Sequence, residues 1–158
     1  MYLVKKIMSS EKLISSNKSA YHEFHIDDKF QAGIVLTGTE IKSVRQGKVN
    51  LKDGFIKVEN GEAWLYNVHI SPYDKGNVHN PQPDRKRKLL LNKKEINKLI
   101  GKTKESGLTI VPIKLYLSEG WAKIEIAVAK GKNIHDKRAT LAKKDMTREI
   151  QRELKDRY

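Results

Sequence analysis

The stretch FIKVENGEAWLYNVHI, residues 55–70, contains two apolar segments separated by Asn60 and Gly61. An Asn-Gly pair readily adopts the positive φ angles that a tight hairpin turn requires. The stretch therefore predicts a β-hairpin, which is the unit from which antiparallel sheets are built.

Two other regions predict strands. Between residues 21 and 36 the apolar side chains stand mainly at even positions, which predicts a half-buried strand or hairpin with Asp27 and Asp28 at a bend. The segments 108–117 and 121–130 flank a short turn, and alternation in the second segment predicts one apolar face. We therefore expect several antiparallel strands.

Two stretches predict short helices. TGTEIKSVRQG is typical of a helix that Thr39 caps and Gly47 closes, and LLLNKKEINKLIGK of a helix that Asn92 caps and Gly101 ends. Together with the strands they predict a mainly β fold, consistent with a small barrel or closed sheet, whose closure periodicity alone does not fix.

Length and charge restrict the class of protein. A chain of 158 residues suits one compact domain, and its net charge of +13 favours a polyanionic partner, with nucleic acid first. The absence of cysteine excludes disulfides, thiolate zinc sites and cysteine nucleophiles, and fits the cytoplasm. Lysines and a glutamate interrupt the apolar residues of the N-terminus, so we expect no signal peptide and no membrane partner.

Basic side chains cluster at residues 85–88, which read Arg-Lys-Arg-Lys at the end of a long loop that contains three prolines. Phosphate oxygens would relieve the repulsion among four consecutive cations, although a solvated surface run is the alternative. Tyr73, His79 and Asn80 precede this run and could stack on unpaired bases or form hydrogen bonds with them.

Glu40 interrupts a basic helix. It is either an ordinary helix-start carboxylate or a group that orders Lys42 and Arg45 or contacts a base edge. Lys42 and Arg45 share one side of the helix, and with Lys48 they suit contacts to the RNA backbone.

The C-terminal region, residues 130–158, carries ten Lys/Arg against five Asp/Glu. As a helix it would align a thin apolar stripe beside a basic stripe, formed by Ala142, Met146, Ile150 and Leu154 and by Lys144, Arg148 and Arg152. An isolated helix of this length is marginal in water, so we expect a tail that is disordered alone and folds against RNA. The alternative is a helix docked on the body.

The candidates for catalysis are weak. Histidines occur at positions 22, 25, 69, 79 and 135, without a metal-ligand motif, a phosphate-binding glycine loop or a nucleophile turn. We therefore expect no enzyme activity, no cofactor and no metal. A structural ribosomal protein and an RNA-processing enzyme are the alternative classes.

Six segments, in order, resemble the SsrA-binding protein (small protein B, SmpB) family: NKSA (17–20), AGIVLTGTEIKSVRQGKVNL (32–51), GEAWLYNVHISPY (61–73), NPQPDRKRKLLLNKKEI (80–96), VPIKLYL (111–117) and AKGKNIHDKR (129–138). The resemblance implies an oligonucleotide-binding-like closed antiparallel β-barrel with flanking α-helices. It also implies binding to the tRNA-like domain of transfer-messenger RNA (SsrA) and delivery of that RNA to stalled ribosomes, where incomplete peptides are tagged.

The resemblance also implies site residues. RNA-binding positions carried onto this chain are Lys18, Glu40, Lys42, Arg45, Asn80, Arg85, Arg87, Lys88, Lys132, Asp136, Lys137 and Arg138. Positions of the tail that would meet the decoding centre and mRNA channel of the 70S ribosome are His135, Lys143, Lys144, Met146, Arg148, Ile150 and Arg152. After Arg138 the match rests on charge pattern and length.

The expected organisation has three parts. Residues 1–16 form a flexible extension, residues 17–138 an RNA-binding barrel domain, and residues 139–158 a basic tail that is disordered or helical depending on ribosome binding. We expect the free protein to be a cytoplasmic monomer.

Overall fold

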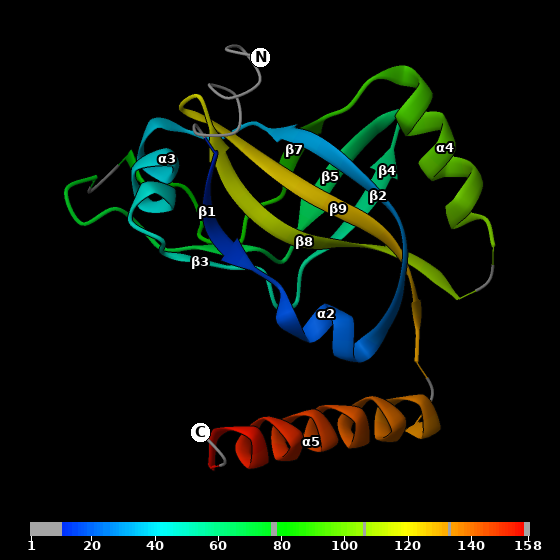
Figure 1. The fold of residues 1–158 in the computed structure, drawn as a ribbon. Coiled ribbons are helices and arrows are strands. Elements are labelled where there is room, and N and C mark those ends of the chain that lie inside the picture. The colour runs from blue at the N-terminus through cyan, green and yellow to red at the C-terminus, as the bar shows by residue number, and fades with distance from the viewer. Residues whose placement is uncertain (1–10, 77–78, 106, 133, 157–158) are drawn as a thin grey trace, which may run out of the picture.

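A computed structural model of the chain describes residues 11–76, 79–105, 107–132 and 134–156, without the side chains of residues 134–141 and 156 (Figure 1). The fold is mainly β with short helices. Its strands are β1 (Glu11–Ser16), β2 (Phe24–Ile34), β3 (Val49–Asn50), β4 (Phe55–Glu59), β5 (Glu62–Tyr66), β6 (His69–Ile70), β7 (Arg87–Leu90), β8 (Leu108–Ser118) and β9 (Trp121–Gly131). Its helices are α2 (Lys18–Glu23), α3 (Gly38–Arg45), α4 (Lys93–Thr103) and α5 (Ile134–Asp156).

Both expected turns are present. Asn60 (φ 51°) and Gly61 (φ 75°) connect β4 to β5 with two positive φ angles, as a tight hairpin requires. Glu119 (φ 51°) and Gly120 (φ 82°) do the same between β8 and β9. The hairpin prediction from the Asn-Gly pair is therefore confirmed.

The strands form a ring of antiparallel pairs. In the order β8–β4–β5–β7–β2–β9 each strand pairs with the next, and β9 pairs back with β8 (Figure 1). β3 and β6 form a separate two-stranded sheet. The prediction of a mainly β fold is confirmed.

The core lies inside this ring because every second side chain of the long strands is apolar. Ile124, Ile126 and Val128 of β9 are fully buried with Leu99 of α4 and Val44 of α3. The helices α3 and α4 are thus held on the sheet by one apolar face each.

α2 covers the opposite face of β8 and β9. Ala20 of α2 packs with Val111 and Ile113 of β8, and with Ala127 and Ala129 of β9, in a second buried cluster. Alanines at these two positions of β9 leave room for a helix close to the sheet.

The region between residues 18 and 34 corrects a prediction. A strand or hairpin was expected from residue 21, but residues 18–23 form α2 and β2 then continues past Asp27 and Asp28. Asn17 anchors the start of α2, since its buried amide donates to the carbonyl of Pro112 (2.9 Å). The register with β9 shifts near the two aspartates, which bends the strand without ending it.

Helix boundaries differ from the sequence prediction in two places. Thr37, and not Thr39, is the N-cap of α3: its hydroxyl accepts from the Glu40 amide (3.3 Å), and the Glu40 carboxylate accepts from the Thr37 amide (2.9 Å). Asn92 caps α4 as predicted. The helix does not end at Gly101 but continues to Thr103, because the buried Leu99 holds that part of the helix on the core.

The expected N-terminal extension is partly a strand. Residues 11–16 form β1, which pairs antiparallel with β8 from Glu11↔Ser118 to Ser16↔Lys114. Backbone hydrogen bonds to the edge of β8 hold this strand, and its mostly exposed side chains gave no periodic signal. Residues 1–10 lie outside the described residues.

α5 begins at Ile134, inside the stretch GKNIHDKR. The division of the chain into a body and a tail at residue 139 stays a prediction. The helix is continuous for 23 residues and lies beside α2 at one end of the body (Figure 1). Within the described part of the chain, no helix combines the length and apolar character needed to cross a membrane.

Candidate RNA-binding site

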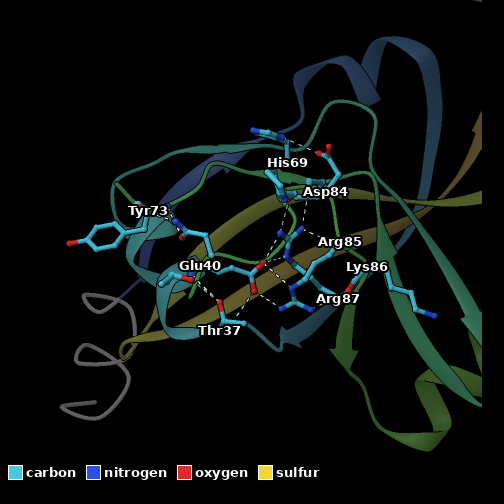
Figure 2. A network of polar contacts seen from close by, with 12 residues as sticks. Thr37, Glu40, His69, Tyr73, Asp84, Arg85, Lys86 and Arg87 are labelled. Atoms are coloured by element: carbon cyan, nitrogen blue, oxygen red, sulfur yellow. Dashed lines mark hydrogen bonds and ion pairs between the residues drawn. The ribbon is translucent and has the colours of Figure 1, made fainter. Parts of the chain in front are cut away.

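A buried carboxylate organises the basic loop before β7. Glu40 is 3% exposed, and its carboxylate accepts hydrogen bonds from Arg87 Nε (2.6 Å), from Arg85 Nε (3.2 Å) and from Arg85 Nη2 (Figure 2). Two guanidinium groups thus meet one carboxylate that the capping box of α3 has already fixed. This network ties α3 to Arg85 and Arg87, which lie 45 and 47 residues after Glu40 in the chain.

Arg87 has no exposed surface, and its remaining N–H groups are also bonded. Nη1 donates to the carbonyls of Val68 (2.7 Å) and Arg85 (3.2 Å), and Nη2 to the carbonyl of Pro83 (2.9 Å). The expectation of four cations free in a loop is therefore wrong, since Arg87 is the buried first residue of β7 and its charge is matched inside the protein.

The ionisation of Glu40 reflects these contacts. Burial alone would raise the pKa of the carboxyl group, but the hydrogen bonds from Arg85, the Thr37 amide and Arg87 outweigh it, so the pKa lies below its usual value. Burial lowers the pKa of Arg87, which Glu40 opposes. The Glu40 carboxyl group is therefore ionised at neutral pH.

The two lysines of the same run point to the β4–β5 hairpin. Lys88 Nζ lies 3.0 Å from Glu62, and Lys86 lies over the Trp64 ring (4.6 Å to its centroid) and 3.6 Å from Glu59. Along residues 85–88 the side chains thus alternate as in a strand: the arginines pair with Glu40, and the lysines pair with Glu59 and Glu62. These pairs were not predictable from local sequence, because the partners lie far away in the chain.

Other exposed cations of the body lie on and next to α3. Lys42 and Arg45 of α3 are exposed, and Lys42 Nζ lies 5.3 Å from the centroid of the Tyr73 ring. Lys48 lies 3.5 Å from Asp74, whose side chain is largely exposed. We call Lys42, Arg45 and Lys48, together with the loop that follows β6, the α3 surface.

A hollow of about 320 Å³ opens on the α3 surface. Its lining residues are Thr37, Gly38, Thr39, Lys42, Tyr73, Lys75, Gly76 and His79. Asn80, a predicted RNA contact, instead uses its side-chain amide on the loop: Oδ1 accepts from the Tyr73 amide (3.0 Å) and Nδ2 donates to the Tyr73 carbonyl (2.9 Å).

Two other predicted contacts, Lys18 and Lys132, lie at α2, which is apart from α3 (Figure 1). Lys18 is exposed at the first position of α2. Lys132 donates through its backbone amide to the Glu23 carbonyl (2.9 Å) and through Nζ to the Tyr21 carbonyl (3.0 Å). The predicted RNA-binding residues are thus divided between two surfaces and one internal network.

The described tail residues are exposed along α5, and they include Lys143, Lys144, Met146, Arg148, Ile150 and Arg152. Met146 (63% exposed) and Ile150 (55% exposed) leave the expected apolar stripe open to solvent. Site predictions also fall on His135, Asp136, Lys137 and Arg138, whose side chains lie outside the described part of the structure. In the described part of the chain no group of three or more His, Asp or Glu side chains could hold a metal ion.

Comparisons with known proteins agree with one another. A sequence model of the family described as SmpB protein matches residues 14–156. The chain is 57% identical to the SsrA-binding protein of Carboxydothermus hydrogenoformans, over 94% of this chain and 99% of that protein. It is 59% identical to the SsrA-binding protein of Halothermothrix orenii, over 92% of this chain and 94% of that protein.

The fold has a solved counterpart. A structure described as "tmRNA-SmpB: a journey to the center of the bacterial ribosome" superposes with a TM-score of 0.66 at 46% sequence identity, over 76% of this chain and 85% of that one. Sequence and fold therefore lead to the same conclusion. The chain belongs to the SmpB protein family.

Proposed function

We propose that this chain is an RNA-binding protein of bacterial trans-translation, which binds transfer-messenger RNA and acts with it on stalled ribosomes. The observation that carries this function is the identity of 57% to an SsrA-binding protein over nearly the whole length of both chains. The similar structure is of a tmRNA–SmpB complex at the ribosome. The net charge of +13 suits RNA partners.

Within the body, the contacts divide the predicted RNA-binding residues by role. Lys18, Lys42 and Arg45 are exposed and suit phosphate contacts. Arg87 and Glu40 are buried, and we assign them to shaping the loop that RNA meets. The partly exposed residues Arg85, Asn80, Lys88 and Lys132 have internal partners, so their role is mainly to position neighbouring groups.

For the tail, we propose that α5 enters the ribosome and that its helix is stabilised there. Its exposed basic and apolar side chains have little support from the body, which favours a helix that forms fully against another surface. His135 falls at its start, and we propose that it lies near the decoding centre. Its neighbours Asp136, Lys137 and Arg138 stay proposed contacts to transfer-messenger RNA.

We further propose that the ring of strands is a closed, oligonucleotide-binding-like barrel, which the return pairing of β9 with β8 supports. We assign it no catalytic activity, because binding and delivery of RNA need no reacting group. A cytoplasmic location follows from partners that are themselves cytoplasmic, and we propose that the free protein is a monomer.

The experiment is a chain that stops after Arg138, compared with the full chain. We expect the truncated chain to bind transfer-messenger RNA within about threefold of the full chain, in competition with ordinary tRNA at moderate salt, and to lose peptide tagging on stalled ribosomes. Loss of both activities together would contradict the division between body and tail. Equal affinity of the full chain for both RNAs would contradict the function itself.

A further inference from the structure

We propose that the hollow on the α3 surface binds one unpaired nucleotide of the RNA, with its base stacked on Tyr73 and its phosphate between Lys42 and Lys75. This inference rests on the proposed function and names a site within it. The hollow has a volume of about 320 Å³, at the lower end of the range of small-ligand pockets.

The position of Tyr73 is fixed before any ligand arrives. The side chain of Asn80 closes the loop by forming two hydrogen bonds with the backbone of Tyr73, at 3.0 and 2.9 Å. Gly76 permits this closure, because a Cβ atom there would lie 2.6 Å from Asn80 Oδ1. The Gly76 amide also donates to the Tyr73 carbonyl (2.9 Å). A preorganised aromatic ring loses little entropy on binding.

The ring is also accessible. Tyr73 is half-buried, and its ring points away from the Glu40 network that lies behind it (Figure 2). Lys42 Nζ lies over one face of the ring, 5.3 Å from its centroid, so a cation already stands at the aromatic system. An aromatic face with an adjacent cation is the combination that single-stranded nucleic acids use for stacking and phosphate contacts.

The charge of the hollow selects an anion. Lys42 and Lys75 are exposed on its rim, and none of the described residues that line it is acidic. The nearby carboxylate of Glu40 is turned inward and neutralised by Arg85 and Arg87. The internal network thus removes the negative charge that would otherwise repel a phosphate.

Other cavities of the described body lack this combination. The polar cavity lined by Asn50, Asp53, Asn67, His69 and Asp84 has two carboxylates and no lysine. The apolar groove beside Trp121 has Lys123 as its charged lining residue and is otherwise suited to apolar groups. Among these three, the hollow at Tyr73 alone combines an aromatic ring, two lysines and no acid.

The nucleotide must be unpaired. In an A-form duplex both faces of each base are stacked on neighbours, so a side chain such as Tyr73 can reach a base face only in a loop, bulge or single strand. We therefore expect a site that is filled by one exposed nucleotide of folded RNA and that prefers stacking to base identity.

The test compares Tyr73→Leu with Tyr73→Phe in the full chain, using transfer-messenger RNA as the probe. Loss of one base stack predicts a weakening of binding of about 5- to 150-fold for Tyr73→Leu. Tyr73→Phe keeps the ring and should stay within about twofold of the unchanged protein. Equal losses in both variants would overturn the stacking role.

Trp64→Leu is the matched control, because Trp64 is also an aromatic ring beneath a lysine but lies outside the hollow. We expect it to keep affinity once urea unfolding shows that it is folded. Lys75→Met adds a surface variant with no folding risk, and it should reduce the salt slope of binding by about one. An unchanged slope in Lys75→Met would overturn the phosphate contact.

Chemical probing of the RNA gives a direct readout. We expect one nucleotide that the unchanged protein protects to become reactive with Tyr73→Leu while the remaining protections persist. Full protection with Tyr73→Leu would overturn the proposal. Failure of the unchanged protein to prefer transfer-messenger RNA over tRNA would instead count against the proposed function, so the two failures are distinguishable.

Discussion

The basic run at residues 85–88 and the basic stripe of α5 are both rich in cations but differ in what surrounds them. In the run, Arg87 is fully buried and bonded to Glu40, and Lys88 is paired with Glu62. Along α5, Lys144 and Arg148 are exposed to solvent. The number of cations in a segment therefore does not predict how many of them can contact RNA, because that depends on their burial and on their acidic partners.

This contrast separates stability from binding. A buried ion pair whose partner is removed leaves an uncompensated charge, which costs several kcal/mol of folding free energy. An exposed cation contributes little to folding but remains available to phosphate. Substitutions in the run should therefore act on the body, and substitutions along α5 should act on the ribosomal step.

The largest effect is expected for Glu40→Gln. The substitution keeps the shape of the side chain but leaves Arg85 and Arg87 without their counter-charge, so the free energy of unfolding in urea should fall by about 3–5 kcal/mol. Glu62→Gln is the matched control, since its pair with Lys88 is exposed and should be worth less than about 1 kcal/mol. Similar losses in both variants would erase the distinction between buried and exposed pairs.

The pH dependence of stability should sharpen the same distinction. The pKa of Glu40 is lowered in the folded state, so its stabilisation is fully present above the unfolded pKa of about 4.3 and is lost as pH falls through the folded pKa. Below about pH 4.5 the melting temperature of the unchanged protein should therefore fall more steeply with decreasing pH than that of Glu40→Gln. Parallel melting curves for both proteins between pH 7 and 3 would contradict the prediction.

Sequence reasoning found the parts of the fold that depend on local chemistry. The Asn60–Gly61 turn follows from the backbone preferences of two residues, and the apolar face of β9 follows from its alternation. The N-terminal caps of α3 and α4 were predicted to within two residues. Each of these features needs only neighbours in the chain.

Features that depend on distant partners were not predictable. Arg87 looks like any cation of its run, and its burial depends on Glu40, 47 residues away. β1 has mostly exposed side chains, so only the free edge of β8 explains it. Asn80 was predicted to contact a base because its amide can both donate and accept hydrogen bonds. In the structure that amide forms two hydrogen bonds with the backbone of Tyr73, which depend on how the loop folds back.

A smaller effect on folding is expected for the triple substitution of Lys144, Arg148 and Arg152 to Gln. These side chains are exposed, so the unfolding free energy of the body should change by less than about 0.5 kcal/mol. Peptide tagging on stalled ribosomes should fall strongly, because the proposed entry of α5 into the ribosome would bring these cations to RNA phosphates. The matched control neutralises Asp145, Glu149 and Glu153, which should leave tagging intact; equal loss in both triples would show that helix content matters and not positive charge.

The smallest effect is expected for Lys132→Met, at the junction between the two regions. Lys132 Nζ donates to the Tyr21 carbonyl (3.0 Å), so its removal should loosen the exit of α5 while changing the affinity for transfer-messenger RNA by less than about twofold. The chain has no cysteine, so spin labels introduced at Glu23→Cys and Arg148→Cys report one distance, whose distribution should broaden in Lys132→Met. The exposed neighbour Lys130→Met is the control and should leave the distribution unchanged. A salt slope of binding that falls by about one in Lys132→Met, with an unchanged distance distribution, would instead identify Lys132 as a phosphate contact.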